Sequence, residues 1–386
     1  MNNRHFRLQG IRQAQQTANR NVGKLFLIGL ASVAAYNWQR WQRDKALAER
    51  LRAAQTPAPA LDNPPQVSAL VAAWNEVEHI DAHIQSFLAL RYPNIELVLC
   101  AGGYDGTLAK ARLYASERVI VIEQHAGEGK QKALARCYEH AHGDVIYLTD
   151  ADCRFDDDAL ARLLGPIVNE GEHAATGGFA PLPEQRQHPF VFNQWAVDTY
   201  ARRYTGTYSS GLIGRNAAVT ARVLQNTGAL AEDVRIGTDY YLAKQLIGAG
   251  YQIRYVADSV VVSQYHTLVG PYIRQQIRWL RNIVIHGYRF AAWQEVIGAL
   301  RNCIIGSSML MLPLIGLIFS PFIFVVGLLG LIAVCINRLR YLMFIGRMRG
   351  EVPTRAYLLA PMYAVLDLYM LLQAGLNIIL TRRNVW

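Results

Sequence analysis

The spacing of apolar and polar positions divides the chain into a central region and two flanks. Between residues 67 and 265, short apolar and β-branched runs alternate with stretches of helical spacing, such as 76–90 and 128–142. The strand-like runs are VSALVAAW, IELVLC, RVIVIE, DVIYLTD and QIRYVADSVVV. This alternation predicts an α/β domain with a mixed, mostly parallel sheet and flanking helices. Ligands of such sheets bind beyond the carboxyl ends of the strands, so we expect the chemistry there.

The two flanks have the pattern of membrane segments. Residues 22–38 are mostly apolar and predict a retained anchor; a signal peptide is the alternative, but no small-residue cleavage site follows. Residues 303–336 contain no charged residue and are too long for one ordinary span. Pro313 and Pro321 interrupt them, which favours a hairpin of two short helices over one long kinked helix. Residues 356–380 are a further candidate span.

These patterns suggest five regions. Residues 1–55 form an N-terminal membrane anchor with a basic juxtamembrane segment, and 56–66 form a proline-rich linker. Residues 67–265 form the α/β domain. Residues 266–301 mix arginines with apolar positions and predict amphipathic helices at the membrane surface, with ordinary core helices as the alternative. Residues 302–386 form a C-terminal membrane region of about three spans.

Composition narrows the class of protein. The chain is 52% hydrophobic and 18% charged, with a formal net charge of +10. Its arginines cluster beside apolar segments, which favours a membrane protein and no nucleic-acid partner. The basic N-terminus conflicts with the positive-inside rule if one span leads into a cytoplasmic domain. The five cysteines form no C-x-x-C pair, so we expect reduced thiols in a cytoplasmic domain rather than zinc or disulfides.

Two carboxylates stand where a strand should end. Asp150 and Asp152 directly follow the apolar run 145–148. Carboxylates one residue apart can present oxygen ligands to one Mg²⁺ or Mn²⁺ ion, and such an ion can neutralise a leaving diphosphate. A solvated acidic loop is the alternative, as at the nearby residues 156–158.

Two further groups lie downstream. Asp239 follows Gly237 and Thr238 at a predicted helix start, where it could act as a general base or cap the helix. Glu232 and Asp233 are competing candidates for the base. A Gln-x-x-Arg-Trp motif then places three side chains on one face of a helix, where a guanidinium can hold a diphosphate and an indole can stack on a sugar; these are Gln275, Arg278 and Trp279.

The order of Asp-x-Asp, a lone Asp, Gln-x-x-Arg-Trp and membrane helices resembles family 2 glycosyltransferases. More narrowly, it resembles the membrane branch with the cellulose, chitin and hyaluronan synthases and the ceramide glucosyltransferases. The resemblance implies a GT-A-type fold and an inverting transfer from a nucleotide sugar, expected to be a UDP-sugar. In it Asp152 contacts the metal, Asp150 lies near the metal, ribose and phosphate, and Asp239 is the base. Gln275, Arg278 and Trp279 serve the pyrophosphate and the acceptor.

The nucleotide-binding segments match the family less closely. Asn75 and Glu76 end the first strand as in the family, and Lys130 lies in a Gly-Lys-x-x-Ala-Leu-like segment. The family's Asp pair after the second strand is replaced by Cys100 and Ala101, although Asp105 survives in an Asp-Gly-Thr sequence. The resemblance assigns donor binding to Asn75, Glu76, Asp105, Lys130 and Asp150. The lost pair motivates the alternative of a degenerate domain that serves as a membrane scaffold or partner subunit.

Two further residues bear on the resemblance. His266 precedes the motif and could be a late metal ligand, although a structural histidine is the simpler interpretation. Gln276 replaces an arginine that many polymer synthases carry, which favours a lipid or short-chain acceptor over a long polysaccharide. We expect an integral protein of the inner membrane with a cytoplasmic catalytic domain, which could form a homo-oligomer.

Overall fold

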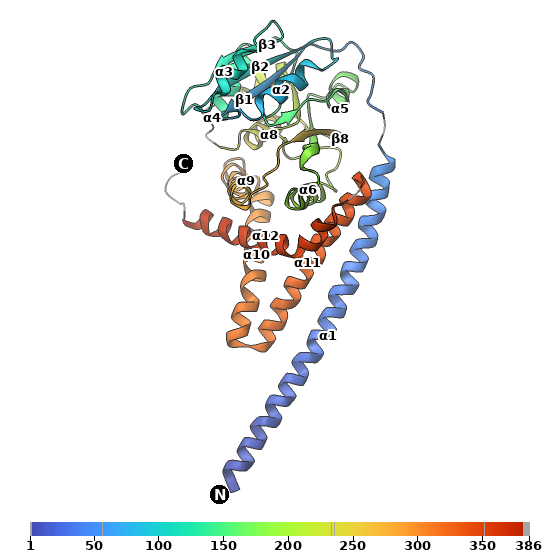
Figure 1. The fold of residues 1–386 in the computed structure, drawn as a ribbon, viewed down its shortest axis with the longest axis vertical. Helices are drawn as coiled ribbons and strands as arrows, with labels where there is room; N and C mark the ends of the chain where they lie inside the picture. Colours follow the sequence, from blue (N-terminus) through green and yellow to red (C-terminus); the bar gives the residue numbers. More distant parts are fainter. Residues whose placement is uncertain (1, 56, 233, 235, 351, 381–386) are drawn as a thin grey trace.

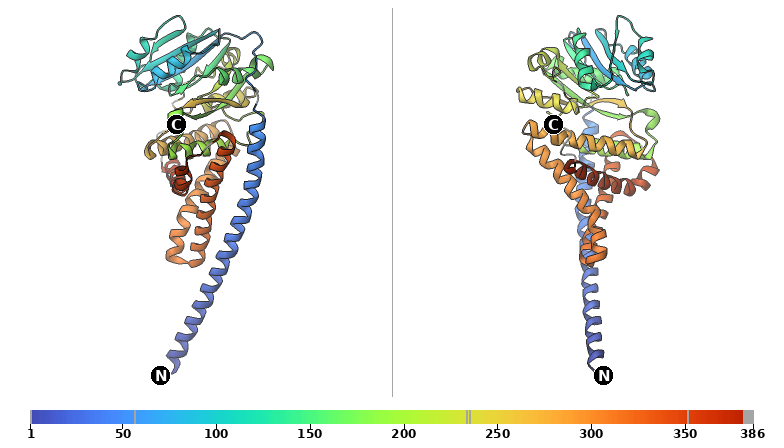
Figure 2. Two further views of the ribbon diagram at one scale, coloured as in Figure 1. Left: turned by 45° about the vertical axis from the view of Figure 1, so that its right-hand side comes forward. Right: turned by 90° about the vertical axis from the view of Figure 1, so that its left-hand side faces the viewer.

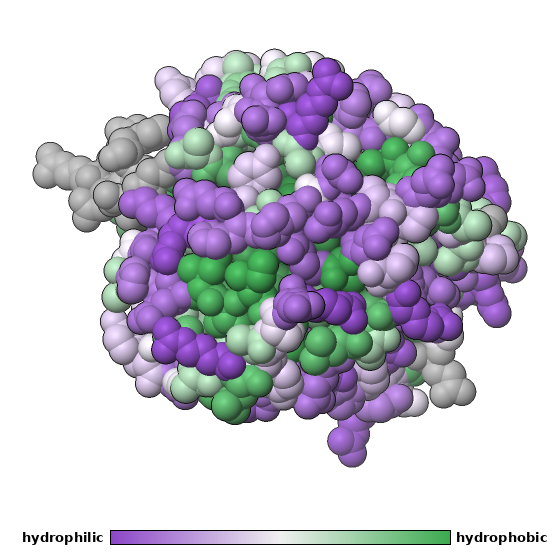
Figure 3. Space-filling model, turned by 90° about the horizontal axis from the view of Figure 1, so that it is seen from above, coloured by the Kyte–Doolittle hydropathy of each residue, from purple (hydrophilic) through white to green (hydrophobic). Residues whose placement is uncertain are grey.

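An α/β domain stands on a group of long helices (Figure 1). The computed structural model describes residues 2–55, 57–232, 234, 236–350 and 352–380, with side chains from residue 21 onward. Seen from the side away from the long helices, the α/β domain is largely hydrophilic, with small apolar patches (Figure 3). The domain therefore has the surface of a water-exposed unit.

One sheet of eight strands forms the centre of the domain, in the order β3-β2-β1-β4-β7-β6-β8-β5. Its strands are β1 (Val67–Trp74), β2 (Ile95–Gly102), β3 (Val119–Glu123), β4 (Val145–Leu148), β5 (Cys153–Arg154), β6 (Ala174–Pro181), β7 (Ala217–Thr220) and β8 (Arg254–Ser263). Strands β3, β2, β1 and β4 run parallel, and β6 is parallel to β8. Strand β7 is antiparallel to both its neighbours. The predicted mixed, mostly parallel sheet is confirmed.

Helices cover both faces of this sheet because its central strands are apolar on both sides. Every residue of β2 is buried, and β1 is nearly so. The helices of the domain are α2 (Ile80–Leu88), α3 (Thr107–Arg112), α4 (Gly129–Glu139), α5 (Asp157–Asn169), α6 (Pro189–Ala201), α7 (Ala221–Thr227) and α8 (Thr238–Gly248). Two apolar cores result, one on each side of the sheet.

Four helices follow the sheet: α9 (Val269–Arg289), α10 (Trp293–Phe319), α11 (Pro321–Arg349) and α12 (Thr354–Leu380). Among the described helices, α10, α11 and α12 are long and apolar enough to cross a membrane. Helices α10 and α11 pair as a hairpin that turns at Ser320, directly before the predicted interruption at Pro321 (Figure 1). Pro313, the other predicted interruption, lies inside α10, which continues through it. Helix α10 continues through residues 301 and 302 without a break, so the boundary expected between the surface helices and the membrane region falls inside one helix.

Helix α12 runs across the α10–α11 hairpin rather than beside it (Figures 1 and 2). It packs against α6, α9, α10 and α11. Asp367, the one acidic or basic residue between Ala356 and Leu380, pairs with Arg338 of α11 and accepts a hydrogen bond from the Tyr272 hydroxyl of α9 at 2.8 Å. The charge that would be costly in lipid is therefore satisfied inside the protein.

The N-terminal helix α1 (Asn2–Ala53) lies alongside α11. Gly29 faces the Leu329 side chain closely, and Asp44 forms a buried ion pair with Arg340 while also accepting a hydrogen bond from Tyr200. The expected anchor 22–38 is part of α1, which is not among the three long apolar helices. The linker after α1 packs on α5, where Asn169 donates to the carbonyl of Ala60 at 2.9 Å.

Candidate functional site

Two connected hollows lie between the sheet and α9. The outer cleft, of about 940 Å³, lies at the carboxyl ends of β1, β3 and β4. The inner pocket, of about 190 Å³, lies between the end of β4, the start of β7, and helices α8 and α9. Five side chains line both hollows: Lys130, Asp150, Arg215, Gln275 and Arg278. The junction is thus formed by three cations, one carboxylate and one amide.

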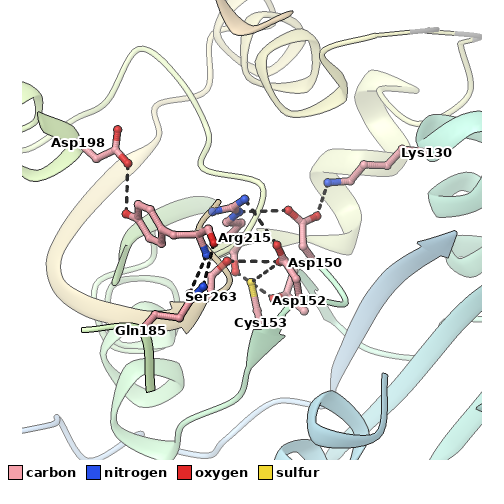
Figure 4. Close-up of polar contacts among 10 residues, drawn as sticks. Lys130, Asp150, Asp152, Cys153, Gln185, Asp198, Arg215 and Ser263 are labelled. Carbon is pink, nitrogen blue, oxygen red and sulfur yellow. Dashed lines mark hydrogen bonds and ion pairs between the residues drawn. The ribbon is translucent and has the colours of Figure 1, made fainter. Parts of the chain in front are cut away.

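Asp150 and Asp152 lie at the end of β4, as the sequence predicts. Asp150 pairs with Lys130 from the first turn of α4 (Figure 4). Asp152 accepts a hydrogen bond from the Ser263 hydroxyl of β8 at 3.3 Å, because β5 and β8 align Cys153 with Ser263. Helix α4 therefore holds one carboxylate at the edge of the cleft, and strand β8 holds the other.

Arg215 is a site residue that sequence reasoning missed. Its Nε lies 3.5 Å from Oδ2 of Asp150, and its Nη2 lies 3.6 Å from Oδ2 of Asp152 (Figure 4). Its guanidinium also lies 5.0 Å from the ring centroid of Phe179. Since β4 and β7 pair antiparallel with Leu148 opposite Ala217, the residues before β7 meet the residues after β4. Only this long-range register could have indicated the contact.

The charges of the junction alter one another's titration. Burial raises the pKa of Asp150, but Lys130 and Arg215 outweigh it, and the net shift is downward. Burial lowers the pKa of Lys130, but Asp150 and Asp239 bring about a net rise. Glu76, which lines the outer cleft, differs: burial and the charges of Asp152, Asp150 and Asp105 raise its pKa to about 7.

Asp239 lines the inner pocket from the first turn of α8. A Cβ on Gly214 would lie 3.0 Å from that of Asp239, so any larger residue before Arg215 would press against the Asp239 side chain. Helix α9 supports the approach to α8: His286 bonds the carbonyl of Ile236 at 2.7 Å, and Asn282 lies against Gly237. The backbone amide of Tyr240 donates to Asp239 at 3.0 Å.

One face of α9 forms the opposite wall of the inner pocket. Gln275, Arg278, Trp279 and Asn282 are three and four residues apart and line it together. Glu232, the competing candidate for the base, pairs instead with Arg289 at 2.7 Å and is not in this lining, while Asp233 lies outside the described residues. Apart from Asp150, Asp239 is therefore the carboxylate among the described residues that lines the inner pocket together with the Gln-x-x-Arg-Trp side chains.

Two of the expected donor-binding residues hold a turn. Asp105 accepts hydrogen bonds from the amides of Val77 and Thr107, both at 3.0 Å, and Asn75 accepts one from the amide of Tyr104 at 2.8 Å. Neither Asp105 nor Asn75 is in the described lining of the outer cleft. Their role in donor binding stays a prediction. The aromatic pair Trp74 and Tyr104, with centroids 5.6 Å apart, lines this part of the cleft instead.

The potential metal ligands of the outer cleft suit a hard divalent ion that is bound by the protein and a substrate phosphate together. Among the described residues there is no cluster of three or more metal-ligating side chains. Asp150 and Asp152 provide carboxylate oxygens, and His266 lines the same cleft. Burial and Arg215 lower the pKa of His266, which favours its neutral form. Mg²⁺ is commonly held by one or two carboxylates together with substrate phosphates, and these residues fit that arrangement.

Comparison with known proteins agrees with this site. A model of the family described as "Glycosyltransferase like family 2" matches residues 64–282, which include both carboxylates, Asp239 and the Gln-x-x-Arg-Trp motif. The chain belongs to glycosyltransferase family 2. This membership confirms the resemblance that the motif order indicated.

The matches to known relatives cover different fractions of this family 2 chain. Hyaluronan synthase of Streptococcus pyogenes is 24% identical over 355 residues, covering 83% of the chain and 82% of the relative. The probable glycosyltransferase YdaM of Bacillus subtilis is 24% identical over 233 residues, and the match spans about half of each protein (56% and 55%). The solved mannosyltransferase PcManGT of Pyrobaculum calidifontis covers 93% of the chain and is itself covered completely, with a TM-score of 0.52 and 17% identity. This likeness supports the GT-A-type fold.

Proposed function

We propose that the chain is a membrane-bound inverting glycosyltransferase that moves a sugar from a nucleotide sugar, of the UDP type, to an acceptor at the membrane surface. The observation that carries the proposal is the cationic junction between the two hollows. A diphosphate there would be near Lys130, Arg215 and Arg278. The nucleoside would then occupy the outer cleft, and the sugar would point into the inner pocket with Asp239.

The described residues suit a single displacement. Asp239 accepts the proton of the acceptor hydroxyl as its oxygen forms the bond to the anomeric carbon. The bond to the diphosphate breaks on the opposite side, and the diphosphate leaves with the electron pair. Arg278 binds this leaving group, and Trp279 provides a flat apolar surface for the acceptor sugar. Mg²⁺ or Mn²⁺, held by Asp150 and Asp152, would supply charge neutralisation for the diphosphate when bound.

The acceptor belongs to one of two classes, a growing polysaccharide or a lipid. The extensive match to a hyaluronan synthase supports the polysaccharide. The position of α9 between the inner pocket and the membrane-type helices is compatible with either (Figure 1). We place the protein in the inner membrane with its catalytic domain in the cytoplasm, where nucleotide sugars are made.

The test is nucleotide release by the purified protein in lipid nanodiscs, with Mn²⁺ and a panel of UDP- and GDP-sugars. We expect release from one donor, abolished by a chelator and reduced at least about 100-fold in Asp239→Asn. Asp62→Asn, an exposed change in the linker, is the matched control and should match the parent. Turnover by Asp239→Asn at the parent's rate would remove Asp239 as the base. Silence with every donor and added lipid would favour the scaffold alternative.

A further inference from the structure

Arg215 lies against both carboxylates of the proposed metal site, where a bound metal ion rather than a protein cation would be expected. It approaches Asp150 and Asp152 through different nitrogens, and its side chain is only 14% exposed. Figure 4 shows the guanidinium directed at the two carboxylates, opposite the side on which Lys130 reaches Asp150. The pair is thus already neutralised before any ion arrives.

The charges of these four groups constrain what can bind. Two carboxylates and two cations cancel. A lone divalent ion that took both carboxylates would leave Arg215 and Lys130 with an uncompensated positive charge, and burial makes this costly for Arg215. A diphosphate brings negative charge of similar size to that of the ion. The charges of these four groups therefore sum to zero when both are absent, and the sum is again zero when both are bound.

Arg215 is placed to move between these two states. It lines the outer cleft and the inner pocket, so a diphosphate at their junction lies within reach of its side chain. The Thr149 hydroxyl fixes its backbone by donating to the Arg215 carbonyl at 2.9 Å, and Phe179 provides a ring surface beside the guanidinium. The backbone is held while the long side chain can change partner.

We propose that the Arg215 guanidinium neutralises Asp150 and Asp152 and so prevents a divalent ion from binding to them without nucleotide. When ion and nucleotide bind together, the Arg215 side chain moves from the carboxylates to the diphosphate. The inference rests on the proposed function, since it needs the junction to be the diphosphate site. By thermodynamic linkage, nucleotide and ion must each strengthen the binding of the other by the same factor.

The experiment is a titration of Mn²⁺ followed by electron paramagnetic resonance, on the whole protein in nanodiscs, without nucleotide and with UDP or GDP. We expect the parent to bind Mn²⁺ weakly alone and about 10- to 100-fold more tightly with the right nucleotide. Arg215→Gln should bind lone Mn²⁺ about 10-fold more tightly than the parent, and the gain from nucleotide should shrink. Arg215→Lys, which keeps the charge, should stay near the parent and covers the case in which the glutamine variant does not fold.

The matched control is Arg112→Gln, which removes an exposed arginine paired with Glu123 outside both hollows and should leave every Mn²⁺ affinity unchanged. Lone Mn²⁺ binding as tight in the parent as in folded Arg215→Gln would overturn the role of Arg215, even if nucleotide and sugar transfer behave as proposed. Absence of nucleotide binding at any Mn²⁺ concentration, in parent and variants alike, would instead overturn the proposed function and this inference with it.

Discussion

At the scale of single residues, the site combines groups whose neighbours decide their charge. Glu76 is half-buried beside the carboxylates of Asp150, Asp152 and Asp105, and Arg215 opposes their effect only in part. Its pKa of about 7 lies above the ordinary value of 4.5. Glu76 therefore exchanges its proton near neutral pH at the edge of the proposed donor cleft.

This shift predicts a pH-dependent stability. Between pH 4.5 and about 7 the folded protein binds more protons at Glu76 than the unfolded chain, so stability falls as pH rises through this window. Glu76→Gln removes the ionisable group. We expect the variant to gain thermal stability over the parent as pH rises to 8, with a difference at pH 8 that is larger than at pH 4. Thermal unfolding at both values measures this, and an equal difference at both would contradict the prediction.

Particular residues show what the sequence could and could not reveal of the site. Asp150, Asp152, Asp239 and Arg278 were predictable because their order along the chain and their places at strand and helix ends carry the information. All four line the two hollows. Arg215 was not predictable, since its contact with Asp150 depends on the antiparallel register of β4 with β7, in which Leu148 lies opposite Ala217. The turn formed by Asp105 likewise depends on a backbone amide of a distant segment.

At the scale of elements, α8 is tied to the start of α10. The Glu295 carboxylate accepts hydrogen bonds from the Tyr240 hydroxyl and from the Lys244 ammonium, and Lys244 also donates to the carbonyl of Ser210 at 2.9 Å. The Lys244 side chain is 7% exposed. A helix that carries Asp239 is thus anchored to a helix of the membrane type.

Removing this tie should affect both stability and turnover. Glu295→Ala leaves a buried ammonium without its counter-charge and should cost about 3 kcal/mol of folding free energy. Because Asp239 begins the same helix, we also expect a lower kcat with little change in nucleotide Kd. Glu295→Gln retains an acceptor and should lie between parent and alanine variant. Unfolding and nucleotide titration test this; an alanine variant as stable and active as the parent would show that the tie is dispensable.

The sequence also predicts some features of the helices and not others. The break at Ser320 was predictable because a proline begins a helix readily and interrupts one at a cost. The direction of α12 was not, because an apolar length permits a span without fixing its tilt. That direction depends on packing, including the contacts of Asp367 with Arg338 and Tyr272.

At the scale of the whole molecule, the α10–α11 hairpin and α12 point in different directions (Figure 2). If the hairpin lies along the membrane normal, α12 lies in the membrane surface. Its exposed apolar side chains form a stripe at helical spacing: Leu358, Met362, Val365, Tyr369, Leu376 and Ile379. Small buried residues on another face, including Ala356, Ala360 and Ala364, pack against the protein. This distribution suits a helix with lipid on one side.

The arrangement predicts the side on which each end of α12 lies. Reporters that are active only in the cytoplasm or only outside it, fused after Gly350 or after Leu380, should give the same side for both positions. A helix that crosses the membrane would place the two reporters on opposite sides. A third fusion at Ser320 tests the hairpin and should report the side opposite to Gly350.

The contact between Tyr272 and Asp367 has a consequence for biosynthesis. The ribosome completes the Gln-x-x-Arg-Trp segment at Trp279, long before it reaches Asp367. Until α12 has been synthesised and has packed against α9, the Tyr272 hydroxyl of α9 lacks its hydrogen-bond acceptor Asp367. A chain interrupted within the membrane hairpin would carry every residue of the two hollows yet lack this support. The fold therefore makes this support of α9 depend on a helix that is synthesised well after the residues of the two hollows.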